Sequence, residues 1–379
     1  MADLNLSTEQ AEQSAVHQDV KEYYGKSLAN TSDLKTTACC TRINKGCLSE
    51  RLRTALGNIH QEVTSKYYGC GLVFPEAVEK CHILDLGSGS GRDCFVLSQL
   101  VGETGYVTGV DMTKEQIEVA RKHVDYHTSK FGYGSPNVVF IEGLIEDVIE
   151  LGIERDSIDV IISNCVINLC PNKWKVFQGA FAALKAGGEL YFSDIYADRP
   201  ISQEARSNKI LHGECISGAL EWKELMSIAL EVGFAPPVLV DASPVTVPDN
   251  PELSSLLGQT QFCSATYRLF KTNHHEHDST LSEEITYNGT IADHPNKIKF
   301  SHDIELKTGT PLVLPASVSL LIKESRLGSH FSFAPWTGQS SPYPSLSSYS
   351  DFNPFQISVP SGCCDNKEAS CASSSKSCC

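Results

Sequence analysis

The chain has 379 residues, which is long enough for one large domain with smaller additions. It carries 46 acidic and 31 basic residues, a formal net charge of −15, and no stripe of lysine and arginine stands out. Nucleic acid and anionic membranes are bound through clustered cations, so we expect neither as a partner. The first residues hold no basic and apolar leader, and no apolar run approaches the roughly 20 residues of a membrane-spanning helix. We therefore expect a cytosolic protein.

Cysteine is unusually frequent, with 15 residues in the chain. Two interpretations compete: a secreted disulfide scaffold, or a thiol protein that binds soft metals or carries out redox chemistry. The absence of a leader and a glycine-rich pattern in the middle of the chain favour the second interpretation. Thiols in a reducing compartment remain available for reaction.

The predicted elements begin with a polar helical segment, residues 1–80, that contains Cys39 and Cys70. From residue 81 to residue 198, apolar runs alternate with amphipathic segments, which is typical of a parallel sheet with helical crossovers. Thr113–Phe131 is predicted to be one helix, opened by a capping box at Thr113 and ended by Gly132. The predicted strands are His82–Leu86, Tyr106–Val110, Val138–Glu142, Ile158–Ser163 and Glu189–Asp194.

Three segments follow this alternating region. Residues 199–271 read as helices that give way to extended chain. Residues 272–335 read as a polar linker and a small β-rich unit. Residues 336–379 are dominated by Ser, Pro, Gly and Cys, and we expect this cysteine-rich tail to be disordered. Its cysteines would either capture a soft metal or be passive.

A glycine-rich turn follows the first predicted strand, in the run Ile83-Leu-Asp-Leu-Gly-Ser-Gly-Ser-Gly-Arg-Asp93. Glycine is needed there because a side chain would block the approach of a ligand to the backbone. The spacing differs from the G-x-G-x-x-G pattern of dinucleotide-binding proteins. Strand, acidic residue and three alternating glycines resemble the first motif of class I methyltransferases. The candidate cofactor residues in this turn are Asp85, Gly87, Ser88, Gly89 and Gly91.

Three further features lie at matching positions. Asp111 ends the second strand, where a carboxylate accepts ribose hydroxyls, and Met112 beside it is a candidate to cover the adenine. Ile145 and Glu146 follow the third strand, where acidic groups of the class I methyltransferases approach the adenine amino group. Leu184-Lys-Ala-Gly-Gly resembles that family's turn into the next strand. The resemblance implies S-adenosylmethionine as cofactor, and an NAD-dependent dehydrogenase is the alternative.

The fourth predicted strand delivers Asn164 and Cys165 to the sheet edge where ligands bind. No histidine or carboxylate stands in that segment as a general base, so a thiolate is either the methyl acceptor or a ligand that holds it. Cys39, Cys70 and Cys215 lie in separate segments, and no local CxxC zinc pattern explains them. Soft thiolates favour thiophilic centres such as As(III), whose lone pair attacks a methyl group without loss of a proton.

The motifs together resemble the arsenite methyltransferases of animals and algae. They are Tyr23-Tyr-Gly, Tyr67-Tyr-Gly-Cys-Gly-Leu-Val, the glycine turn, Ser163-Asn-Cys-Val-Ile-Asn-Leu169 and Gly213-Glu-Cys215. The resemblance implies that Cys165 and Cys215 bind As(III). Cys70 and Cys39 would act as a further ligand and as redox partners, and Tyr68 and Asn164 would contact the cofactor.

The same resemblance implies a doubly wound α/β sheet of the Rossmann-like class I type. A helical segment would precede the sheet, residues 199–271 would form an arsenic-binding α/β region, and a small β-rich unit would follow. As(III) would arrive as thiol conjugates, and thioredoxin or glutathione would reopen a transient disulfide, with Cys39–Cys70 as one candidate pair. We expect a monomer.

Other interpretations remain at this stage. A non-catalytic As(III) sensor would keep the fold without the reaction, and a small-molecule or sterol methyltransferase would need a large apolar pocket and neither cysteine. Single cysteines are usually small core residues, which is the expectation for Cys81, Cys94, Cys170 and Cys263. The tract His274-His-Glu-His277 is expected to be a solvated linker.

Overall fold

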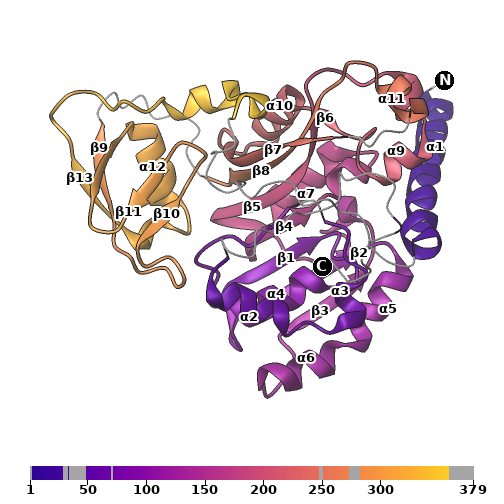
Figure 1. The fold of residues 1–379 in the computed structure, drawn as a ribbon, viewed down its shortest axis with the longest axis horizontal. Coiled ribbons are helices and arrows are strands. Elements are labelled where there is room, and N and C mark those ends of the chain that lie inside the picture. The colour runs from indigo at the N-terminus through magenta and orange to yellow at the C-terminus, as the bar shows by residue number, and fades with distance from the viewer. Residues whose placement is uncertain are drawn as a thin grey trace, which may run out of the picture.

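A computed structural model describes residues 2–28, 33, 48–69, 71–246, 251–272 and 282–357. A mixed sheet forms the middle of the molecule, with helices on both faces and a smaller β-rich unit at one side (Figure 1). Within these described ranges, no helix is both long and apolar enough to cross a membrane.

The central sheet has the strand order β3-β2-β1-β4-β5-β8-β7, and the short strand β6 pairs with β5. Strands β1 to β5 are parallel, whereas β8 runs antiparallel between β5 and β7. This confirms the predicted doubly wound α/β sheet. The strands are β1 (His82–Leu86), β2 (Tyr106–Asp111), β3 (Val138–Glu142), β4 (Ile158–Asn164), β5 (Leu184–Ala197), β6 (Leu220–Glu221), β7 (Val238–Val245) and β8 (Phe262–Phe270).

All five predicted strands are present. The largest difference is at β5, which extends beyond the predicted Glu189–Asp194 at both ends. Its first residue pairs with Ile158 of β4, and its second half pairs with β8 along the whole length of that strand. Strands β7 and β8 therefore continue the same sheet past residue 198.

Helices cover both faces of the sheet and the edge near the amino terminus. They are α1 (Ala2–Glu22), the π-helical turn η1 (Tyr23–Ser27), α2 (Glu50–Gly57), α3 (Gln61–Thr64), α4 (Arg92–Val101), α5 (Lys114–Lys122), α6 (Val124–Phe131), α7 (Lys173–Ala183), α8 (Gln203–Arg206), α9 (Lys209–Gly213), α10 (Trp222–Val232) and α11 (Pro251–Leu257). Short 3-10 turns η4 (Ile145–Asp147) and η5 (Ile167–Leu169) follow β3 and β4.

The prediction of one helix over Thr113–Phe131 was wrong in two respects. The segment breaks into α5 and α6 at His123, whose backbone leaves the helical region. The Thr113 side chain makes no capping hydrogen bond. The Thr113 N–H, which the Gln116 side chain would bind in a capping box, donates to the Asp111 carboxylate at 2.7 Å. Gly132 does end the segment, as predicted, and its backbone is left-handed.

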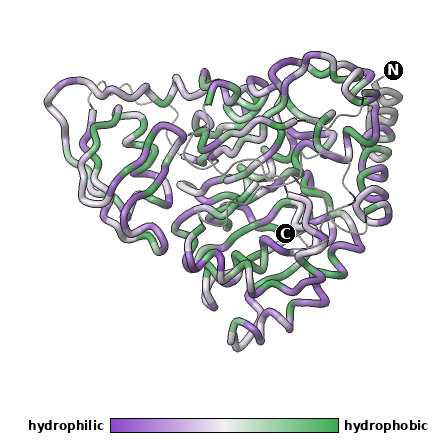
Figure 2. The backbone as a smooth tube through the Cα atoms, in the orientation of Figure 1, coloured by the Kyte–Doolittle hydropathy of each residue, from purple (hydrophilic) through white to green (hydrophobic). Residues whose placement is uncertain are grey.

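The core lies on the two faces of the sheet. Figure 2 shows apolar residues concentrated along the central strands and polar residues along the outer helices and loops. One face packs Leu84, Ile161 and Phe192 under α7 and α10, and the other packs Ile83 and Val107 under α2 and α4. Strands that are apolar on both sides need such cover on both sides.

The carboxy-terminal unit has its own apolar core, which includes Ile285, Phe300 and Ile322. Its elements are β9 (Glu283–Tyr287), β10 (Lys297–Lys299), β11 (Glu305–Lys307), β12 (Pro311–Leu314), α12 (Ala316–Glu324), the 3-10 turn η6 (Gly328–His330) and β13 (Phe331–Pro335). The predicted small β-rich unit is therefore present.

The prediction of disorder from residue 336 onward was wrong for residues 336–357. They form the 3-10 turns η7 (Leu346–Asp351) and η8 (Pro354–Gln356). Tyr349 is buried in the carboxy-terminal core, and Phe355 packs against the core of the main sheet. These aromatic side chains provide the apolar burial that the surrounding serines and prolines lack. The remaining tail residues, 358–379, lie outside the described part of the chain.

Candidate active site

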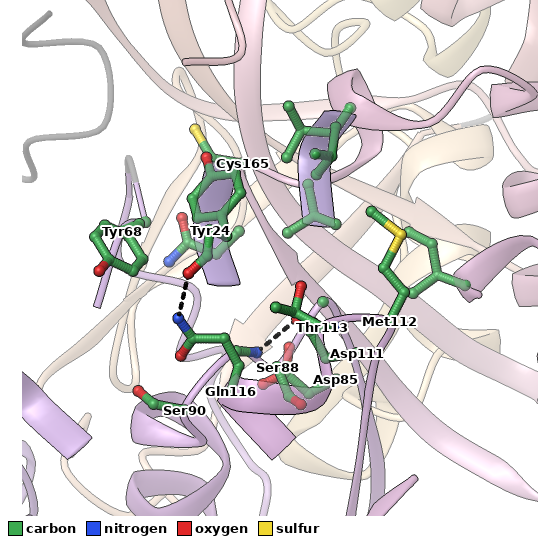
Figure 3. Close-up of a pocket in the computed structure, with 18 of the residues that line it drawn as sticks. Tyr24, Tyr68, Asp85, Ser88, Ser90, Asp111, Met112, Thr113, Gln116 and Cys165 are labelled. Carbon is green, nitrogen blue, oxygen red and sulfur yellow. Dashed lines mark hydrogen bonds between the residues drawn. The ribbon is translucent and has the colours of Figure 1, made fainter. Parts of the chain in front are cut away.

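A pocket opens at the carboxyl ends of β1, β2 and β4, where ligands bind in open α/β sheets (Figure 3). Ten of the eleven predicted cofactor residues line it. The exception is Gly91, which does not line the pocket and is the amino-terminal cap of α4. The ten are Tyr68, Asp85, Gly87, Ser88, Gly89, Asp111, Met112, Ile145, Glu146 and Asn164.

The glycine turn has the conformation that only glycine adopts without strain. Gly87, Gly89 and Gly91 have φ values of +78°, +52° and +88°. A Cβ at Gly87 would lie 2.4 Å from the Val166 side chain, and one at Gly91 would lie 2.6 Å from the Phe140 ring. A Cβ at Gly89 would meet nothing within 4 Å, so this glycine presents open backbone to the pocket.

Two buried carboxylates give the pocket its electrostatic character. Burial, reinforced by the neighbouring Asp93, raises the pKa of Asp85 to about 8, and the Cys94 thiol donates to Asp85 at 3.1 Å. Burial also raises the pKa of Asp111, although its carboxylate accepts the Gly89 N–H at 2.9 Å. Carboxylates destabilised by burial are stabilised by a cation, so the pocket favours a ligand with positive charge.

The pocket also presents polar groups that have no partner among the described residues. These are the hydroxyls of Ser88 and Tyr68, and burial raises the pKa of Tyr68 to about 12. Unsatisfied buried hydroxyls are costly, which points to a ligand that supplies the missing hydrogen bonds. Open glycine backbone, acidic groups and free hydroxyls together fit the polar, cationic S-adenosylmethionine.

Cys165 and Cys215 come together beside this pocket. Ligand atoms of Cys165, Cys215 and Asp194 all lie within 4.8 Å of one another. The Cys215 Sγ donates to the Cys165 carbonyl at 3.0 Å, and Cys165 itself lines the pocket. Both cysteines have left-handed backbone, with φ of +59° and +64°, which is uncommon for a residue with a side chain.

The two sulfurs differ in oxidation state. Cys165 is disulfide-bonded, whereas Cys215 is not part of a disulfide. Among the described residues, Cys81, Cys94, Cys170 and Cys263 are also outside any disulfide. Three of these are buried, as expected for small core residues, but Cys170 also lines the pocket.

Asp194 at β5 fixes the turn that follows Cys165. Its carboxylate accepts the N–H groups of Asn168 at 3.0 Å and of Ile195 at 2.9 Å. Burial raises its pKa to about 7, and those backbone donors oppose the rise. The Asn168 side chain in turn donates to the Cys215 carbonyl at 3.3 Å, so this network ties the two cysteine segments together.

Asn164 fixes the segment around residue 70. Its side chain accepts the Gly71 N–H at 3.0 Å and donates to the Tyr67 hydroxyl at 2.6 Å. The predicted residues Cys70 and Cys39 lie outside the described part of the chain, and so does the suggested Cys39–Cys70 disulfide.

Several pocket residues were missed by sequence reasoning. Arg92 and Asp93 pair at the start of α4, next to the glycine turn, and proximity to that motif was the available signal. Asp194, outside the pocket lining, was missed as well: it lies on a predicted strand, but only the folded chain brings its carboxylate within 4.8 Å of both cysteine sulfurs. The other missed residues lie on α1, η1 and α5 and in the segment that follows α3, and include His17, Val20, Tyr24, Lys66, Tyr67 and Gln116.

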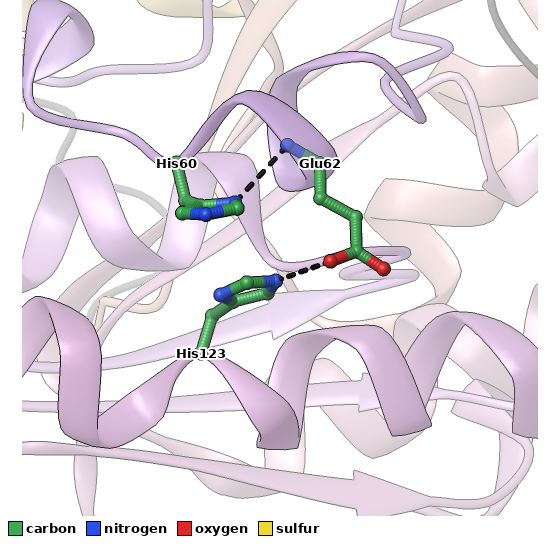
Figure 4. A group of neighbouring side chains, drawn as sticks. All are labelled: His60, Glu62 and His123. Atoms are coloured by element: carbon green, nitrogen blue, oxygen red, sulfur yellow. Dashed lines mark hydrogen bonds and ion pairs between the residues drawn. The ribbon is translucent and has the colours of Figure 1, made fainter.

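A second cluster with metal-ligand chemistry lies between α3 and α5 (Figure 4). His60, Glu62 and His123 offer ligand atoms within 4.8 Å of one another. The two imidazole rings, however, are stacked 3.9 Å apart with a tilt of 26°. A metal ion lies in the plane of each imidazole ring that binds it. The planes of two rings stacked in this way intersect too far from the ring nitrogens for one ion to bind both. The cluster is instead an ionic contact, in which Lys122 and His123 lower the pKa of Glu62 to about 2.

Comparisons with known proteins agree with this geometry. Residues 77–233 match the family described as a methyltransferase domain, and residues 280–379 match the arsenite methyltransferase C-terminal domain. An arsenite methyltransferase of Rattus norvegicus is 49% identical over 84% of this chain and 85% of its own length. One from the bacterium Aquipseudomonas alcaligenes is 44% identical over 84% of this chain and 90% of its own length.

A solved structure shares the architecture as well. The arsenic(III) S-adenosylmethionine methyltransferase of Chlamydomonas reinhardtii superposes with a TM-score of 0.72 and 39% identity. The match covers 76% of this chain and 97% of the algal one. Sequence identity, both domain matches and the fold agree, and the chain therefore belongs to the arsenite methyltransferase family.

Proposed function

We propose that this protein transfers the methyl group of S-adenosylmethionine to As(III) held by protein thiolates, giving mono- and dimethylated arsenicals. One observation carries the assignment of the acceptor. The sulfurs of Cys165 and Cys215 lie within 4.8 Å of each other, and Cys165 borders the cofactor pocket. Two sulfurs at this separation can share a single arsenic atom.

The cofactor would be held by the pocket residues described above. Asp85, which lines the pocket, would accept a cationic amino group, and Asp111, which also lines it, would accept ribose hydroxyls. Met112 and Ile145 supply apolar contacts, while Glu146 supplies an acceptor for the adenine amino group. When bound, S-adenosylmethionine supplies a methyl group on a positively charged sulfur.

The protein's own part in the reaction is to hold and orient As(III). Cys165 and Cys215 would bind it together with a third thiolate, for which Cys70 is our candidate. Arsenic bound by three sulfurs retains a lone pair on its open face, and that lone pair is the nucleophile. An arsenic lone pair carries no proton, so the methyl transfer needs no general base. Orientation of the two reacting groups is then the main catalytic contribution.

Methyl transfer formally raises arsenic from the trivalent to the pentavalent state. Two thiolates can return two electrons and form one disulfide, which an external thiol reopens. The disulfide bond at Cys165 supports this requirement, since a sulfur in a disulfide cannot bind As(III) until it is reduced. We propose thioredoxin or glutathione as the reductant, Cys39 as a redox partner, and a monomer in the cytosol as the working form.

The test is methyl transfer from labelled S-adenosylmethionine to As(III) in the presence of a thiol. Cys165→Ser and Cys215→Ser should each reduce product to background, while S-adenosylhomocysteine still protects both variants against heat. Cys81→Ser is the matched control, because Cys81 is a free thiol outside the pocket.

Full methylation by both variants would refute the thiolate site. Cofactor binding without any product from the wild-type protein would favour a sensor. Methylation of an organic acceptor that persists in both serine variants would favour a small-molecule methyltransferase.

A further inference from the structure

Two consecutive tyrosines in η1 stand between the cofactor pocket and the segment of Cys215. η1 continues α1, and the Leu28 N–H closes its wide turn on the Tyr23 carbonyl at 3.1 Å. π-helical turns are rare and occur often at functional sites. Here the turn lets Tyr23 and Tyr24 contact adjacent residues of one distant segment.

On the cofactor side, Tyr24 is part of the pocket wall (Figure 3). Its carbonyl accepts the Gln116 side-chain N–H at 3.3 Å. Its ring packs edge-on against Tyr68, with 5.4 Å between centroids and an angle of 67°. His17 of α1, six residues before Tyr23, pairs with Glu146 at 2.9 Å. Gln116, Tyr68 and Glu146 of the pocket wall are thus joined to this one helical segment.

On the acceptor side, the same tyrosines hold the two residues that precede Cys215. The Tyr24 hydroxyl donates to the Gly213 carbonyl at 2.7 Å, and the Tyr23 hydroxyl donates to the Glu214 carboxylate at 2.8 Å. Glu214 is fully buried. A Cβ at Gly213 would lie 2.8 Å from the Tyr23 ring, so the contact is close as well as polar.

Cys215 needs such support because of its backbone. Its φ of +64° is unfavourable for a residue with a side chain and persists only where surrounding contacts impose it. The Cys215 N–H is held by the His212 carbonyl at 3.0 Å, at the end of α9. The tyrosine contacts at Gly213 and Glu214 fix the chain immediately before this strained residue.

We propose that Tyr23 and Tyr24 are positioning residues that hold the Cys215 turn, and that Tyr24 makes this hold depend on an occupied cofactor pocket. The inference rests on the proposed function, because it takes Cys215 as an arsenic ligand. A bound cofactor restrains the Tyr24 ring, the ring restrains Gly213, and Cys215 is then fixed for As(III). By reciprocity, bound As(III) strengthens cofactor binding by the same factor.

The experiment measures the dissociation constant of S-adenosylhomocysteine with reduced full-length protein, without As(III) and with saturating As(III). Cysteines elsewhere in the chain do not disturb this readout, because the observed ligand is the nucleoside. Wild-type protein should bind S-adenosylhomocysteine about 5- to 10-fold more tightly with As(III) present, a typical coupling between two sites. The readout is therefore the ratio of the dissociation constant without As(III) to the constant with As(III). Tyr24→Phe retains the ring but removes the Gly213 hydrogen bond, and this ratio should fall to about 1 in the variant.

Further variants separate positioning from general stability. Tyr23→Phe should lower kcat for As(III) methylation about tenfold. Its dissociation constant for S-adenosylhomocysteine, measured without As(III), should change by less than about threefold. Glu214→Gln keeps an oxygen for Tyr23 and should retain the coupling. Tyr106→Phe, at an exposed tyrosine on the far end of β2, is the control and should match wild type.

A wild-type ratio of 1 would overturn the inference, and so would an unchanged ratio in Tyr24→Phe. If the wild type methylates As(III) in either of these cases, the proposed function stands and only the inference fails. If the wild type yields no methylated arsenic, the proposed function fails first.

Discussion

Asp85 is buried at the end of β1, and its surroundings set how the cofactor pocket responds to pH. With a pKa of about 8, this carboxyl is protonated at neutral pH until a cation binds beside it. Binding of the S-adenosylhomocysteine ammonium group then requires release of that proton. Below pH 8, affinity should rise with pH by up to about tenfold per unit, and it should level off above pH 8.

Calorimetric titration between pH 6.5 and 9 checks this prediction. Asp85→Asn cannot release a proton and should show weaker binding with a flatter pH profile. Equal pH profiles for the two proteins would show that Asp85 is already ionised in the free pocket.

His127 makes folding stability depend on pH. The ring is fully buried and stacked on Phe95, its Nδ1–H donates to the His123 carbonyl at 2.8 Å, and its Nε2 accepts the His60 N–H at 3.1 Å. Burial lowers its pKa to about 4, whereas the unfolded chain has a histidine pKa of about 6.5. The unfolded state therefore binds the proton more tightly. Stability should be lost as pH falls from about 6.5 to about 4.

Urea unfolding of wild type and His127→Gln at pH 7 and at pH 5 measures this effect. The variant should be less stable at pH 7, yet lose less stability than wild type on acidification. A wild-type loss no greater than the variant's would contradict the buried neutral histidine.

Individual site residues differed in how predictable they were. Asp85, Asp111 and Cys165 each follow a strand, so sequence position alone places them at the ligand-binding edge. Asp194 also lies on a predicted strand, but only the pairing of β4 with β5 brings it beside the two cysteines. Tyr24 lies 58 residues before the start of β1, the strand that leads into the glycine turn, and no local pattern indicates that it returns to the pocket.

At the scale of elements, Gly91 in the turn from β1 into α4 has to be glycine for two separate reasons. Its φ is +88°, and a Cβ would lie 2.6 Å from the Phe140 ring. Gly132 shares the first reason, with φ of +76°, but its surroundings are open. Gly132→Ala should therefore cost about 1 kcal/mol for the strained backbone, and Gly91→Ala about 2–4 kcal/mol, since overpacking is added.

Denaturant unfolding of the two alanine variants compares them directly. Equal losses of stability would mean that the Phe140 contact relaxes without cost. A heat-protection assay with S-adenosylhomocysteine shows whether Gly91→Ala also disturbs the pocket.

The elements show what a local pattern can and cannot predict. The five strands were predictable because short β-branched apolar runs bounded by turn residues are typical of buried strands. The break between α5 and α6 was missed, because the contacts of His123 with Glu62 and of His127 with residue 60 come from a different helix. The capping box did not form at Thr113, because the Asp111 carboxylate, two residues earlier, accepts the Thr113 N–H.

At the scale of the whole molecule, a buried ionic network joins the carboxy-terminal unit to the main sheet. Arg326, just after α12, donates to Glu189 of β5 at 2.8 Å and to the carbonyls of Glu76 and Ala77 at 2.6 Å. Arg268 of β8 is fully buried and pairs with the same Glu189 at 3.2 Å. Removing one partner of such a network leaves buried charge, at a cost of about 3–5 kcal/mol.

Arg326→Met should therefore lower the free energy of unfolding by about 3 kcal/mol and expose the carboxy-terminal unit to limited proteolysis. Lys297→Met is the matched control in the same unit, since Lys297 and its partner Glu305 are 60% and 40% exposed. That variant should lose less than about 1 kcal/mol. Similar losses for both variants would mean that the network does not hold the two units together.

Amino-acid composition predicted the order and the attachment of the carboxy-terminal segments less well than local patterns predicted single strands. Serine and proline after residue 336 predicted disorder, but three aromatic residues in residues 349–355 pack onto cores formed far earlier in the chain. The small β-rich unit was predictable from its extended segments. Its attachment was not, because Arg326 and Glu189 are 137 residues apart and meet only after the sheet has formed.

The sharing of one arsenic atom by Cys165 and Cys215 is tested most directly by anomalous diffraction at the arsenic absorption edge. Crystals of the reduced protein would be grown with arsenite and S-adenosylhomocysteine. We predict one arsenic peak bonded to both sulfurs, on the side of Cys165 that faces the cofactor pocket. A peak bonded to only one of these cysteines, or arsenic found only on other cysteines of the chain, would contradict it.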